Sequence, residues 1–517
     1  MARDSARQAK EVELKLEFDP ANAALLASHP ALEASPQEEL QLISTYFDTP
    51  DCALHKAGVY LRVREVGARY VQTVKTAKSK TELIERLEWE REISGRNPDL
   101  DGVEGTPLKP LLTPEIRVSL QPVFETRIRR HIFRIERNGS EIEVAIDRGE
   151  VASRTATREI CELELELKGG ETKELFRLAR ILTETVPLRL EVKTKAERGY
   201  ELLQGGGFKV EKAADIDIAP KTATGEAFRA IARSCLRQII VNEPALCAGR
   251  AEGLHQMRIG LRRLRAAIAV FSEIVADEDQ ERIRAELKWI TQELGPARDL
   301  DVFAAGVLDP LRASHPGDAD MAVTQFDFEE KRKEAYVRAA CCIRSDRFRN
   351  AVLDLAEWVE TGGWGAGGGH ERKALRTRAV EEHAQQELGR LRKQIKRKGA
   401  GLRHLGVRQR HRLRIRVKRL RYATEFFAAT FPGDGSSKRR LESLAALKDL
   451  QDALGGLNDL ATRHELMAGA QQVDADGAET SAPTSRLAAP DTEAEPLLVK
   501  ADQAFARFAA TRSFWKP

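Results

Sequence analysis

Two short segments of the chain carry alternating glutamates, a residue type that could bind a cation. Residues 11–15 read Glu-Val-Glu-Leu-Lys, and residues 162–168 read Glu-Leu-Glu-Leu-Glu-Leu-Lys. Because side chains alternate across a β-strand, the acids of each segment share one face and the aliphatic residues share the other. Like charges on one face repel, so a cation should lie among them. Mg²⁺ and Mn²⁺ prefer carboxylate oxygens, and the two segments are therefore predicted to be walls of one metal site.

Basic residues alternate in the same way between these two segments. Residues 61–64 read Leu-Arg-Val-Arg, residues 73–75 read Thr-Val-Lys, and arginines recur within residues 124–135. Any one of these strands could belong to an antiparallel sheet that is wet on one side. Taken together, roughly eight strands with clustered arginines opposite clustered glutamates favour a barrel whose interior holds a metal ion and a polyanion. Hydrolysis of a phosphoanhydride needs mainly such charges and a positioned water, without a nucleophilic Ser, Cys or His.

Residues 8–205 resemble the CYTH domain, the triphosphate tunnel metalloenzyme fold. The resemblance begins with the Glu-x-Glu-x-Lys signature at residues 11–15 and continues through further motifs in the family's order. These motifs are Tyr46-Phe47-Asp48-Thr49-Pro50, Leu61-Arg62-Val63-Arg64, Thr73-Val74-Lys75, Arg86-Leu87-Glu88-Trp89-Glu90, Asp147-Arg148-Gly149-Glu150, residues 162–168 and Thr194-Lys195-Ala196-Glu197-Arg198-Gly199-Tyr200. The resemblance implies an antiparallel eight-stranded β-tunnel, which we assign to residues 1–215. A strand is expected at residues 189–195.

The same resemblance implies a role for each matching charged residue. The carboxylates that would hold one or two Mg²⁺ ions, with Mn²⁺ as an alternative, are Glu11, Glu13, Asp147, Glu164 and Glu166. The implied substrate-binding residues are Arg62, Arg64, Lys75, Arg86, Glu88 and Arg127, with Arg129 and Arg130 competing for the place of Arg127. The implied catalytic residues are Lys15, which would support the leaving group or the attacking water, and Lys195.

Length and composition indicate a soluble protein of more than one domain. The chain has 517 residues, of which 42% are apolar and 32% charged, and its formal net charge is +4. We find no apolar leader at the N-terminus and no apolar run of membrane-spanning length, so we expect a cytoplasmic protein that does not enter a membrane. The glycines at 205–207 and the polar run to Pro220 separate the strand-rich part from a helical part, residues 216–517.

The helical part contains an internal repeat. Residues 255–265 align with residues 411–421, and Leu294-Gly295-Pro296-Ala297-Arg298-Asp299-Leu300 aligns with Leu454-Gly455-Gly456-Leu457-Asn458-Asp459-Leu460. Two copies of one helical unit predict an all-α duplicated bundle. On a helical wheel, one face of each copy is basic, and an apolar stripe beside it should face the core. The basic faces consist of His255, Arg258, Arg262 and Arg265 in the first copy and His411, Arg414, Lys418 and Arg421 in the second.

The second basic face has no acidic balance. From Arg390 to Tyr422 there are 15 Lys or Arg and no Asp or Glu. A cationic helix face is usually solvated and balanced by acids three or four residues away, so this local excess indicates an anionic partner. Few aromatic residues interrupt the basic helices, which favours inorganic polyphosphate over nucleic acid as that partner.

Residues 220–515 resemble the CHAD domain, on the evidence of His-x-x-Arg-Ile, Lys-Arg-Leu-Arg-Tyr and Leu-Gly-x-x-Arg-Asp-Leu. The second copy departs from the pattern by carrying Asn458 where the first has Arg298. This resemblance implies polyphosphate binding. Together, the two parts predict an α+β protein similar to the CYTH-CHAD inorganic triphosphatases, acting on tripolyphosphate or on polyphosphate ends. A nucleotide-cyclising or thiamine-triphosphate-hydrolysing enzyme and a non-catalytic polyphosphate-binding protein remain alternatives, and the oligomeric state is left open.

Overall fold

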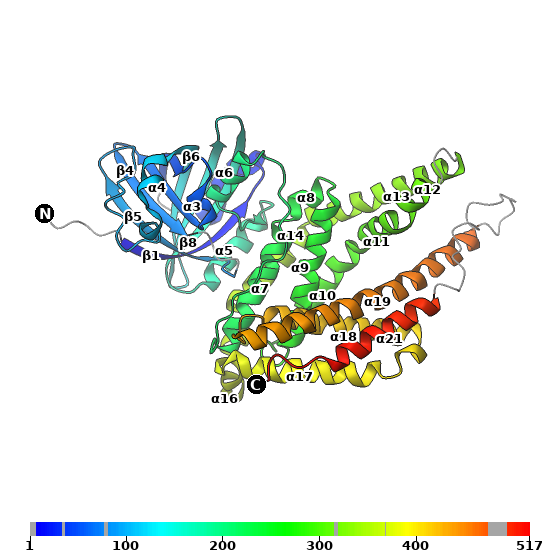
Figure 1. The fold of residues 1–517 in the computed structure, drawn as a ribbon. Helices are drawn as coiled ribbons and strands as arrows, with labels where there is room; N and C mark the ends of the chain where they lie inside the picture. The colour runs from blue at the N-terminus through cyan, green and yellow to red at the C-terminus, as the bar shows by residue number, and fades with distance from the viewer. Residues whose placement is uncertain are drawn as a thin grey trace. The chain divides into compact units, whose positions relative to one another are not determined.

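The computed structural model of the chain describes residues 7–33, 37–76, 81–314, 319–367, 369–473 and 494–516. The chain divides into two compact units (Figure 1). The first consists of Met1–Ala213, Arg233–Gly260 and Ala340–Gly362, and the second of Ala214–Ala232, Leu261–Ala339 and Gly363–Pro517. Two segments of the helical part thus belong to the unit that contains the sheet. The domain boundary near residue 215 stays a prediction.

The first unit is built on one antiparallel sheet of nine strands, where eight were predicted. The additional strand, β9, has two residues and pairs with β1. β1 pairs with β5 through residues 7–12 and with β8 through residues 13–17, so it links both ends of the strand order β5-β4-β3-β2-β6-β7-β8-β1-β9. The strands are β1 (Arg7–Glu17), β2 (Gln37–Asp48), β3 (Val59–Val66), β4 (Arg69–Thr76), β5 (Glu85–Ile93), β6 (Gln121–Arg137), β7 (Ser140–Ala152), β8 (Thr157–Gly169) and β9 (Arg189–Leu190).

The aliphatic faces of the glutamate-bearing strands are buried. Leu14 and Leu16 of β1 and Leu163 and Leu165 of β8 are each at most 1% exposed. Helix α5 (Lys173–Thr183) packs against both strands and contributes a buried apolar side of its own. The alternation predicted from the sequence is therefore confirmed, and the charged face of these strands is turned away from this core.

A helix begins where the sequence predicted the end of a strand. β9 ends at Leu190, and α6 (Lys195–Leu203) starts four residues after Glu191. Thr194 Oγ1 accepts the backbone N–H of Glu197 at 3.1 Å, and Glu197 Oε2 accepts the backbone N–H of Thr194 at 2.8 Å. This capping box satisfies two backbone donors that a helix start leaves without partners. The strand predicted for residues 189–195 is confirmed at residues 189–190 and is wrong for residues 191–195, where the Thr-x-x-Glu pattern instead starts a helix.

The remaining helices of the first 213 residues are short, and the helical part contains both long and short helices. The short ones are α1 (Ala23–Ala27), α2 (Pro30–Glu33), α3 (Ala53–Lys56) and α4 (Pro114–Ser119). The helical part contains α7 (Thr224–Ile240), α8 (Glu243–Cys247), α9 (Ala251–Val270), α10 (Gln280–Glu293), α11 (Gly295–Phe303), α12 (Asp309–Ser314), α13 (Ala319–Arg344), α14 (Asp346–Thr361), α15 (Gly363–Ala366), α16 (Gly369–Thr377), α17 (Val380–Gly399), α18 (Val407–Phe426), α19 (Asp434–Val473) and α21 (Ala494–Ala510). Among the described residues, none of these helices combines the length and the hydropathy needed to cross a membrane.

The two repeat segments form helices α9 and α18, as predicted. The apolar stripe of α18 is buried at Leu413, Val417 and Leu420, and its counterpart on α9 is buried at Met257, Leu261 and Leu264. Phe271 and Phe427, which follow the two helices at equivalent positions, are also fully buried. The hydrophobic periodicity of the repeat therefore identified the core-facing side of both helices.

Candidate functional site

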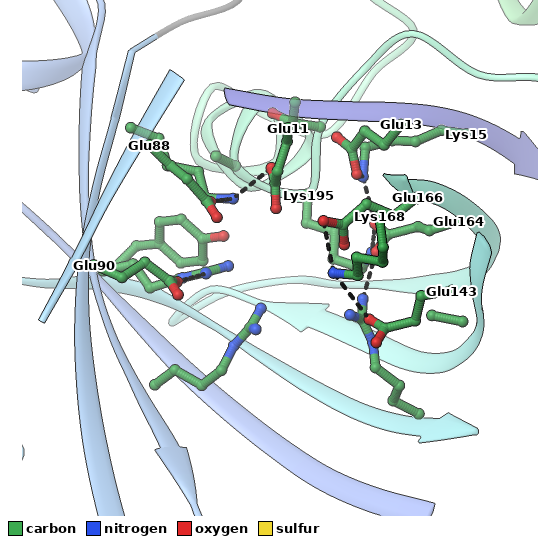
Figure 2. A pocket seen from close by; sticks show the side chains of 18 residues that line it. Glu11, Glu13, Lys15, Glu88, Glu90, Glu143, Glu164, Glu166, Lys168 and Lys195 are labelled. Carbon is green, nitrogen blue, oxygen red and sulfur yellow. Dashed lines mark hydrogen bonds and ion pairs between the residues drawn. The ribbon is translucent and has the colours of Figure 1, made fainter. Parts of the chain in front are cut away.

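A cavity of about 280 Å³ opens on the charged face of the sheet, and Figure 2 shows its side chains pointing into a common space. Most residues singled out from the sequence line this cavity, and the lining as a whole comes from the eight strands β1–β8 and the start of α6. The lining residues are Glu11, Glu13, Lys15, Tyr46, Arg62, Arg64, Lys75, Glu88, Glu90, Arg130, Glu143, Ala145, Glu164, Glu166, Lys168, Thr194, Lys195 and Ala196. Opposite charges therefore meet in a small volume.

Strand register places three glutamates in one row across three strands. Glu13 of β1 lies opposite Glu166 of β8, and Glu166 lies opposite Glu143 of β7. Like charges directly opposite each other destabilise a sheet unless a cation separates them. Lys168 Nζ lies 2.7 Å from Glu166 and 3.6 Å from Glu143, and it neutralises part of this row.

Glu11 lies beside this row and has one cationic partner, Lys75, at a long distance. Its Oε2 atom is buried and accepts no hydrogen bond within the described residues, and Lys75 Nζ lies 3.6 Å from it. Burial raises the pKa of Glu11, and Lys75 offsets this effect only in part. Burial likewise raises the pKa of Glu166 despite its contact with Lys168. This end of the cavity therefore has an electrostatic deficit that a bound cation would relieve.

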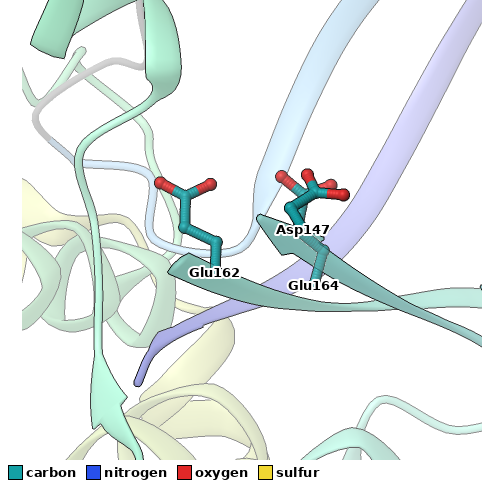
Figure 3. Close-up of side chains that lie close together, drawn as sticks. All are labelled: Asp147, Glu162 and Glu164. Atoms are coloured by element: carbon teal, nitrogen blue, oxygen red, sulfur yellow. The ribbon is translucent and has the colours of Figure 1, made fainter. Parts of the chain in front are cut away.

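The next acids along the same strands have their cations in place. Figure 3 shows the side chains of Asp147, Glu162 and Glu164 close together. One carboxylate oxygen of each lies within 4.8 Å of the others. Lys195 Nζ contacts all three carboxylates, at 2.8 Å from Asp147 and 2.9 Å from Glu164. Arg130 donates to both oxygens of Asp147 at 2.7 Å. These acids form a compact cluster, but ammonium and guanidinium groups already occupy their oxygens.

Glu164 is the centre of this network. It accepts hydrogen bonds from Lys15, Lys195 and Arg130, and the last of these is 2.5 Å long. Burial alone would raise the pKa of Glu164, but the three neighbouring cations outweigh it and hold this pKa well below its usual range. Glu164 therefore stays ionised and fixes the positions of both lysines that the sequence assigned to catalysis.

The arginines form the opposite wall, and one of them has no carboxylate partner. Arg62 donates to Thr73 Oγ1 at 3.2 Å and approaches Glu90 at 3.5 Å. Arg64 donates to Ser44 Oγ at 3.1 Å and makes no ion pair with a carboxylate of the described residues. Burial, followed by the nearby charges of Arg62 and Arg130, lowers the pKa of Arg64 to about 10. Arg64 is therefore the arginine of this wall that a bound anion would stabilise most.

Two described residues of the predicted site, Arg127 and Asp147, are not part of the cavity lining, and a third, Arg86, has a side chain that the structure does not describe. Arg127 is exposed and pairs with Glu125 and Glu150 on the other face of β6, and Arg130 takes its place in the cavity. Asp147 lies just behind the lining and reaches the cavity through Lys195 and Arg130. The side chain of Arg86 lies outside the described residues, although its backbone pairs with that of Glu11.

Sequence reasoning missed several lining residues that a detectable signal could have identified. Arg130 lies two residues from Ile128 and from Ile132, so it shares the inward face with two buried side chains. Arg127 and Arg129 alternate with that face and point outward. Lys168 belongs to the same alternating strand as Glu164 and Glu166. Glu143 had no such signal, because its place depends on the register of β7 against β8.

The second predicted site lies on the basic helices. On α18, Arg408, Arg410, Arg412, Arg414 and Arg416 make no ion pair with the carboxylates of the described residues. His411 is exposed, and its Nδ1 lies 2.8 Å from Asn458 Oδ1, so the departure of the second repeat from Arg298 provides a hydrogen-bond partner for this histidine. Arg421 pairs with Glu425 at 3.0 Å, and Lys418 and Arg414 are half-buried beside it. On α9, His255, Arg258, Arg262 and Arg265 lie on the equivalent helix.

Comparison with known proteins identifies two families in the chain. Residues 9–200 match the CYTH domain, and residues 230–468 match the CHAD domain. An inorganic triphosphatase of Haemophilus influenzae is 31% identical over 199 residues, which are 37% of this chain and 55% of that protein. The chain thus matches about half the length of this curated relative.

Among solved structures, the CHAD domain of the plant Ricinus communis is 27% identical, with a TM-score of 0.47, over 59% of this chain and 99% of that one. A Hippeastrum protein named as an adenylyl cyclase with a dominant triphosphatase activity is 19% identical, with a TM-score of 0.29, over 37% of this chain and 95% of that one.

Proposed function

Because the chain carries a CYTH domain followed by a CHAD domain, we propose that it is a metal-dependent inorganic triphosphatase that also binds polyphosphate through its basic helices. The reaction is the attack of water on the terminal phosphorus of tripolyphosphate, with release of phosphate and diphosphate. The name of the Haemophilus influenzae relative supports this reaction class.

One observation carries the proposal: acids outnumber their lysine partners at one end of the cavity, and Arg64 lies in the same cavity without a carboxylate partner among the described residues. Four acids at one end, Glu11, Glu13, Glu143 and Glu166, share three lysines, Lys15, Lys75 and Lys168, and two of these lysines also pair with Glu164 or Glu88. Among the cavity arginines, Arg62 and Arg130 pair with carboxylates, whereas Arg64 makes no ion pair with a carboxylate of the described residues. A divalent cation bound to a polyanion would balance the excess of acids and would also give Arg64 an anionic partner. A neutral substrate or a simple monoanion would leave the excess of acids near Glu11 without a balancing cation.

The residues that fit a divalent ion best are Glu11, Glu13 and Glu166. The Oε2 atom of Glu11 is buried without a hydrogen bond, and carboxylate oxygens are the ligands that Mg²⁺ and Mn²⁺ prefer. Asp147 and Glu164, which belong to the same predicted ligand set, are engaged by lysine and arginine side chains. A bound Mg²⁺ would withdraw negative charge from the phosphate oxygens and so favour attack by water.

The protein's own cations would bind and orient the triphosphate. Arg62, Arg64 and Arg130 present guanidinium groups that match phosphate oxygens in pairs. Lys15 and Lys195 remain charged, because burial alone would lower the pKa of each lysine but the surrounding carboxylates outweigh it and raise both. Both lysines could therefore stabilise the charge that develops on the leaving diphosphate.

The lining favours an inorganic substrate over a nucleotide. Among the described lining residues, Tyr46 is the aromatic side chain, and its ring already stacks on Phe124 with centroids 4.5 Å apart. A base would therefore find no free ring on which to stack inside the cavity. An adenine or thiamine group would have to remain outside while its triphosphate entered.

The five arginines of α18 support polyphosphate binding. They all belong to one helix, they make no ion pair with described carboxylates, and spaced cations neutralise a phosphate chain with a strong dependence on salt. The eight repeat residues named above, from His255 to Arg421, are the proposed contacts. His411 would add a donor next to these arginines when protonated.

Phosphate release by the full chain tests the proposed reaction. Tripolyphosphate, ATP and thiamine triphosphate would be compared at equal concentration with Mg²⁺, with Mn²⁺ and with excess EDTA. We expect kcat/KM for tripolyphosphate to exceed those for the other two by about tenfold or more, and EDTA to abolish release. Faster release from ATP or thiamine triphosphate would support an alternative function, and no release from any substrate would support a protein that only binds polyphosphate.

A further inference from the structure

A buried arginine lies behind the turn that brings Lys195 into the cavity. Arg237 of α7 is 6% exposed, and like Lys195 it belongs to the first compact unit. Its Nη2 donates to Glu197 Oε1 at 2.6 Å, and its Nη1 donates to the carbonyl oxygen of Val192 at 3.1 Å. One guanidinium group therefore bonds to the chain on both sides of Lys195.

The bonded segment is the helix start itself. Glu197 uses its other carboxylate oxygen to accept the N–H of Thr194, the residue that caps α6. Because Lys195 is the first residue of α6, the direction of its side chain depends on the geometry of this capping turn. Arg237 thus binds the second oxygen of the carboxylate that caps the start of this helix.

The later part of α6 is held independently. The hydroxyl of Tyr200 donates to Asp48 Oδ2 at 2.8 Å. Gly199 lies against Phe124 so closely that a Cβ atom would fall 2.2 Å from Phe124 Cε2. The body of the helix would therefore stay seated if Arg237 were lost, and the change would be confined to the first turn, where Lys195 lies.

The pairing of Arg237 with Glu197 cannot be replaced by a simple charge. Burial alone would lower the pKa of Arg237, but Glu197 and Glu211 outweigh it and raise this pKa, so the group stays charged. A lysine at this position has a single ammonium group and cannot hold both acceptors in the planar arrangement of a guanidinium. Removal of the arginine would take this ion pair from a partly buried carboxylate.

We propose that Arg237 is a positioning residue of the triphosphatase reaction, which acts by fixing the first turn of α6 and hence the ammonium group of Lys195. The inference rests on the proposed function of the cavity. Lys195 Nζ is held at 2.8 Å from Asp147 and 2.9 Å from Glu164, and these contacts require the helix start to stay in place.

The test compares Arg237→Met with Arg233→Met in the full chain. Arg233 lies one turn earlier on α7 and forms a similar buried ion pair, with Glu360, so it controls for the loss of a buried arginine. We expect Arg237→Met to lower kcat for tripolyphosphate about tenfold, with a smaller change in KM, because misplacement of a charge-stabilising group acts mainly on the transition state. Arg237→Lys should recover less than half of that loss, and Arg233→Met should match the parent.

A double-mutant cycle distinguishes positioning from general damage. If Arg237 acts through Lys195, Arg237→Met should change kcat less than twofold in a Lys195→Ala background. A further tenfold loss in that background would overturn the proposal, and so would parent-like kcat in the Arg237→Met protein. If Arg237→Met fails to fold, Glu197→Gln removes the same ion pair and is subject to the same criteria.

A measurement that does not depend on activity separates this inference from the proposed function. The rate at which an amine-reactive reagent labels Lys195, measured by mass spectrometry, reports how firmly its ammonium is held. We expect labelling to be at least threefold faster in Arg237→Met than in the parent and in Arg233→Met. An inactive parent with this labelling difference would refute the triphosphatase function and retain the positioning role, whereas equal labelling would refute the positioning role.

Discussion

The cavity of the sheet and the surface of α18 both carry dense charge, but they compensate it in opposite ways. In the cavity, Lys15 and Lys195 have two or more carboxylate partners each, within a largely buried network. On α18, five arginines have no carboxylate partner among the described residues and remain in contact with solvent. Buried charges must be paired because desolvation is costly, whereas exposed charges are stabilised by water until an anion arrives.

This difference separates two modes of phosphate recognition. A network with fixed partners predefines where each charge of a short substrate must lie, so it suits catalysis. Arginines of one helix that are open to solvent do not fix where each phosphate must lie. They therefore suit a long, repetitive polyanion of any length. Each prediction below tests one side of this contrast against the other.

The largest effect is expected from the row of glutamates. Glu13→Gln removes a charge from the set proposed to hold the metal ion, and we expect tripolyphosphate hydrolysis to fall by about 1,000-fold or more, or ~4 kcal/mol. EDTA should have the same effect on the parent. Glu150→Gln is the matched control, because Glu150 pairs with Arg127 outside the cavity. If Glu13→Gln retained more than a tenth of the parent activity in a phosphate-release assay, the metal site would have to lie elsewhere.

The second effect concerns a buried group that the helical unit keeps neutral. His383 packs against Phe271 at 4.6 Å between ring centroids, and burial, followed by the charge of Arg378, lowers its pKa to about 4. Above pH 6.5 the histidine is neutral in both the folded and the unfolded states, so its protonation does not reduce the free energy of unfolding. As the pH falls from 6.5 to 4, the unfolded state gains a proton first, and unfolding should become easier by up to ~3 kcal/mol.

Thermal unfolding of the full chain at pH 7, 5.5 and 4 measures this effect. The variant His383→Phe keeps an aromatic ring in place and removes the titration, so its midpoint should fall less with acidification than that of the parent. Equal pH dependence in the two proteins would show that His383 does not couple to unfolding.

A third effect compares two arginines of the same unit. Arg64 lines the cavity without a carboxylate partner, and Arg127 is exposed and paired on the other side of the sheet. We expect Arg64→Ala to lower kcat/KM for tripolyphosphate by about 10- to 150-fold, equivalent to ~1.5–3 kcal/mol, the range of a charge-assisted hydrogen bond. Arg127→Ala should stay within twofold of the parent. The opposite ranking in steady-state kinetics would contradict the placement of the substrate.

The smallest effect is expected on α18. Charge reversal of Arg414 and Lys418 together should weaken the binding of long polyphosphate about tenfold and reduce the slope of log affinity against log salt by ~2. Hydrolysis of tripolyphosphate should remain unchanged, because these residues are not part of the cavity lining. The double variant Lys331→Glu/Lys333→Glu makes the same change in net charge on α13 and serves as the control. Unchanged polyphosphate binding in a salt titration would exclude this face as the binding surface.

The sequence alone predicted which strands carry the chemistry. Alternation identified Glu11, Glu13, Glu164 and Glu166 as residues of one face, and motif spacing identified Arg62 and Arg64, because side-chain direction in a strand follows from parity. The helical period also identified the buried stripes of α9 and α18. These properties are local, and a local pattern is sufficient to determine them.

The alternation of β6 would also have favoured Arg130 over Arg127, because Arg130 lies two residues from the buried Ile128 and Ile132 and so shares their face of the strand. The start of α6 at Lys195 was likewise encoded locally, by Thr194 and Glu197. Both signals were present in the sequence. The family resemblance favoured Arg127 instead of Arg130, and the alternation of charged residues favoured a strand instead of a helix start at Lys195.

Only the tertiary structure decided which charges face each other. The pairing of β1 with β8, about 150 residues away, places Glu13 opposite Glu166, and the register of β8 against β7 adds Glu143 to the same row. The ion pair between Arg237 and Glu197 joins α7 to the first turn of α6, where Lys195 lies. Register and packing between distant segments depend on the free energy of the whole fold, so no local pattern of residues specifies them.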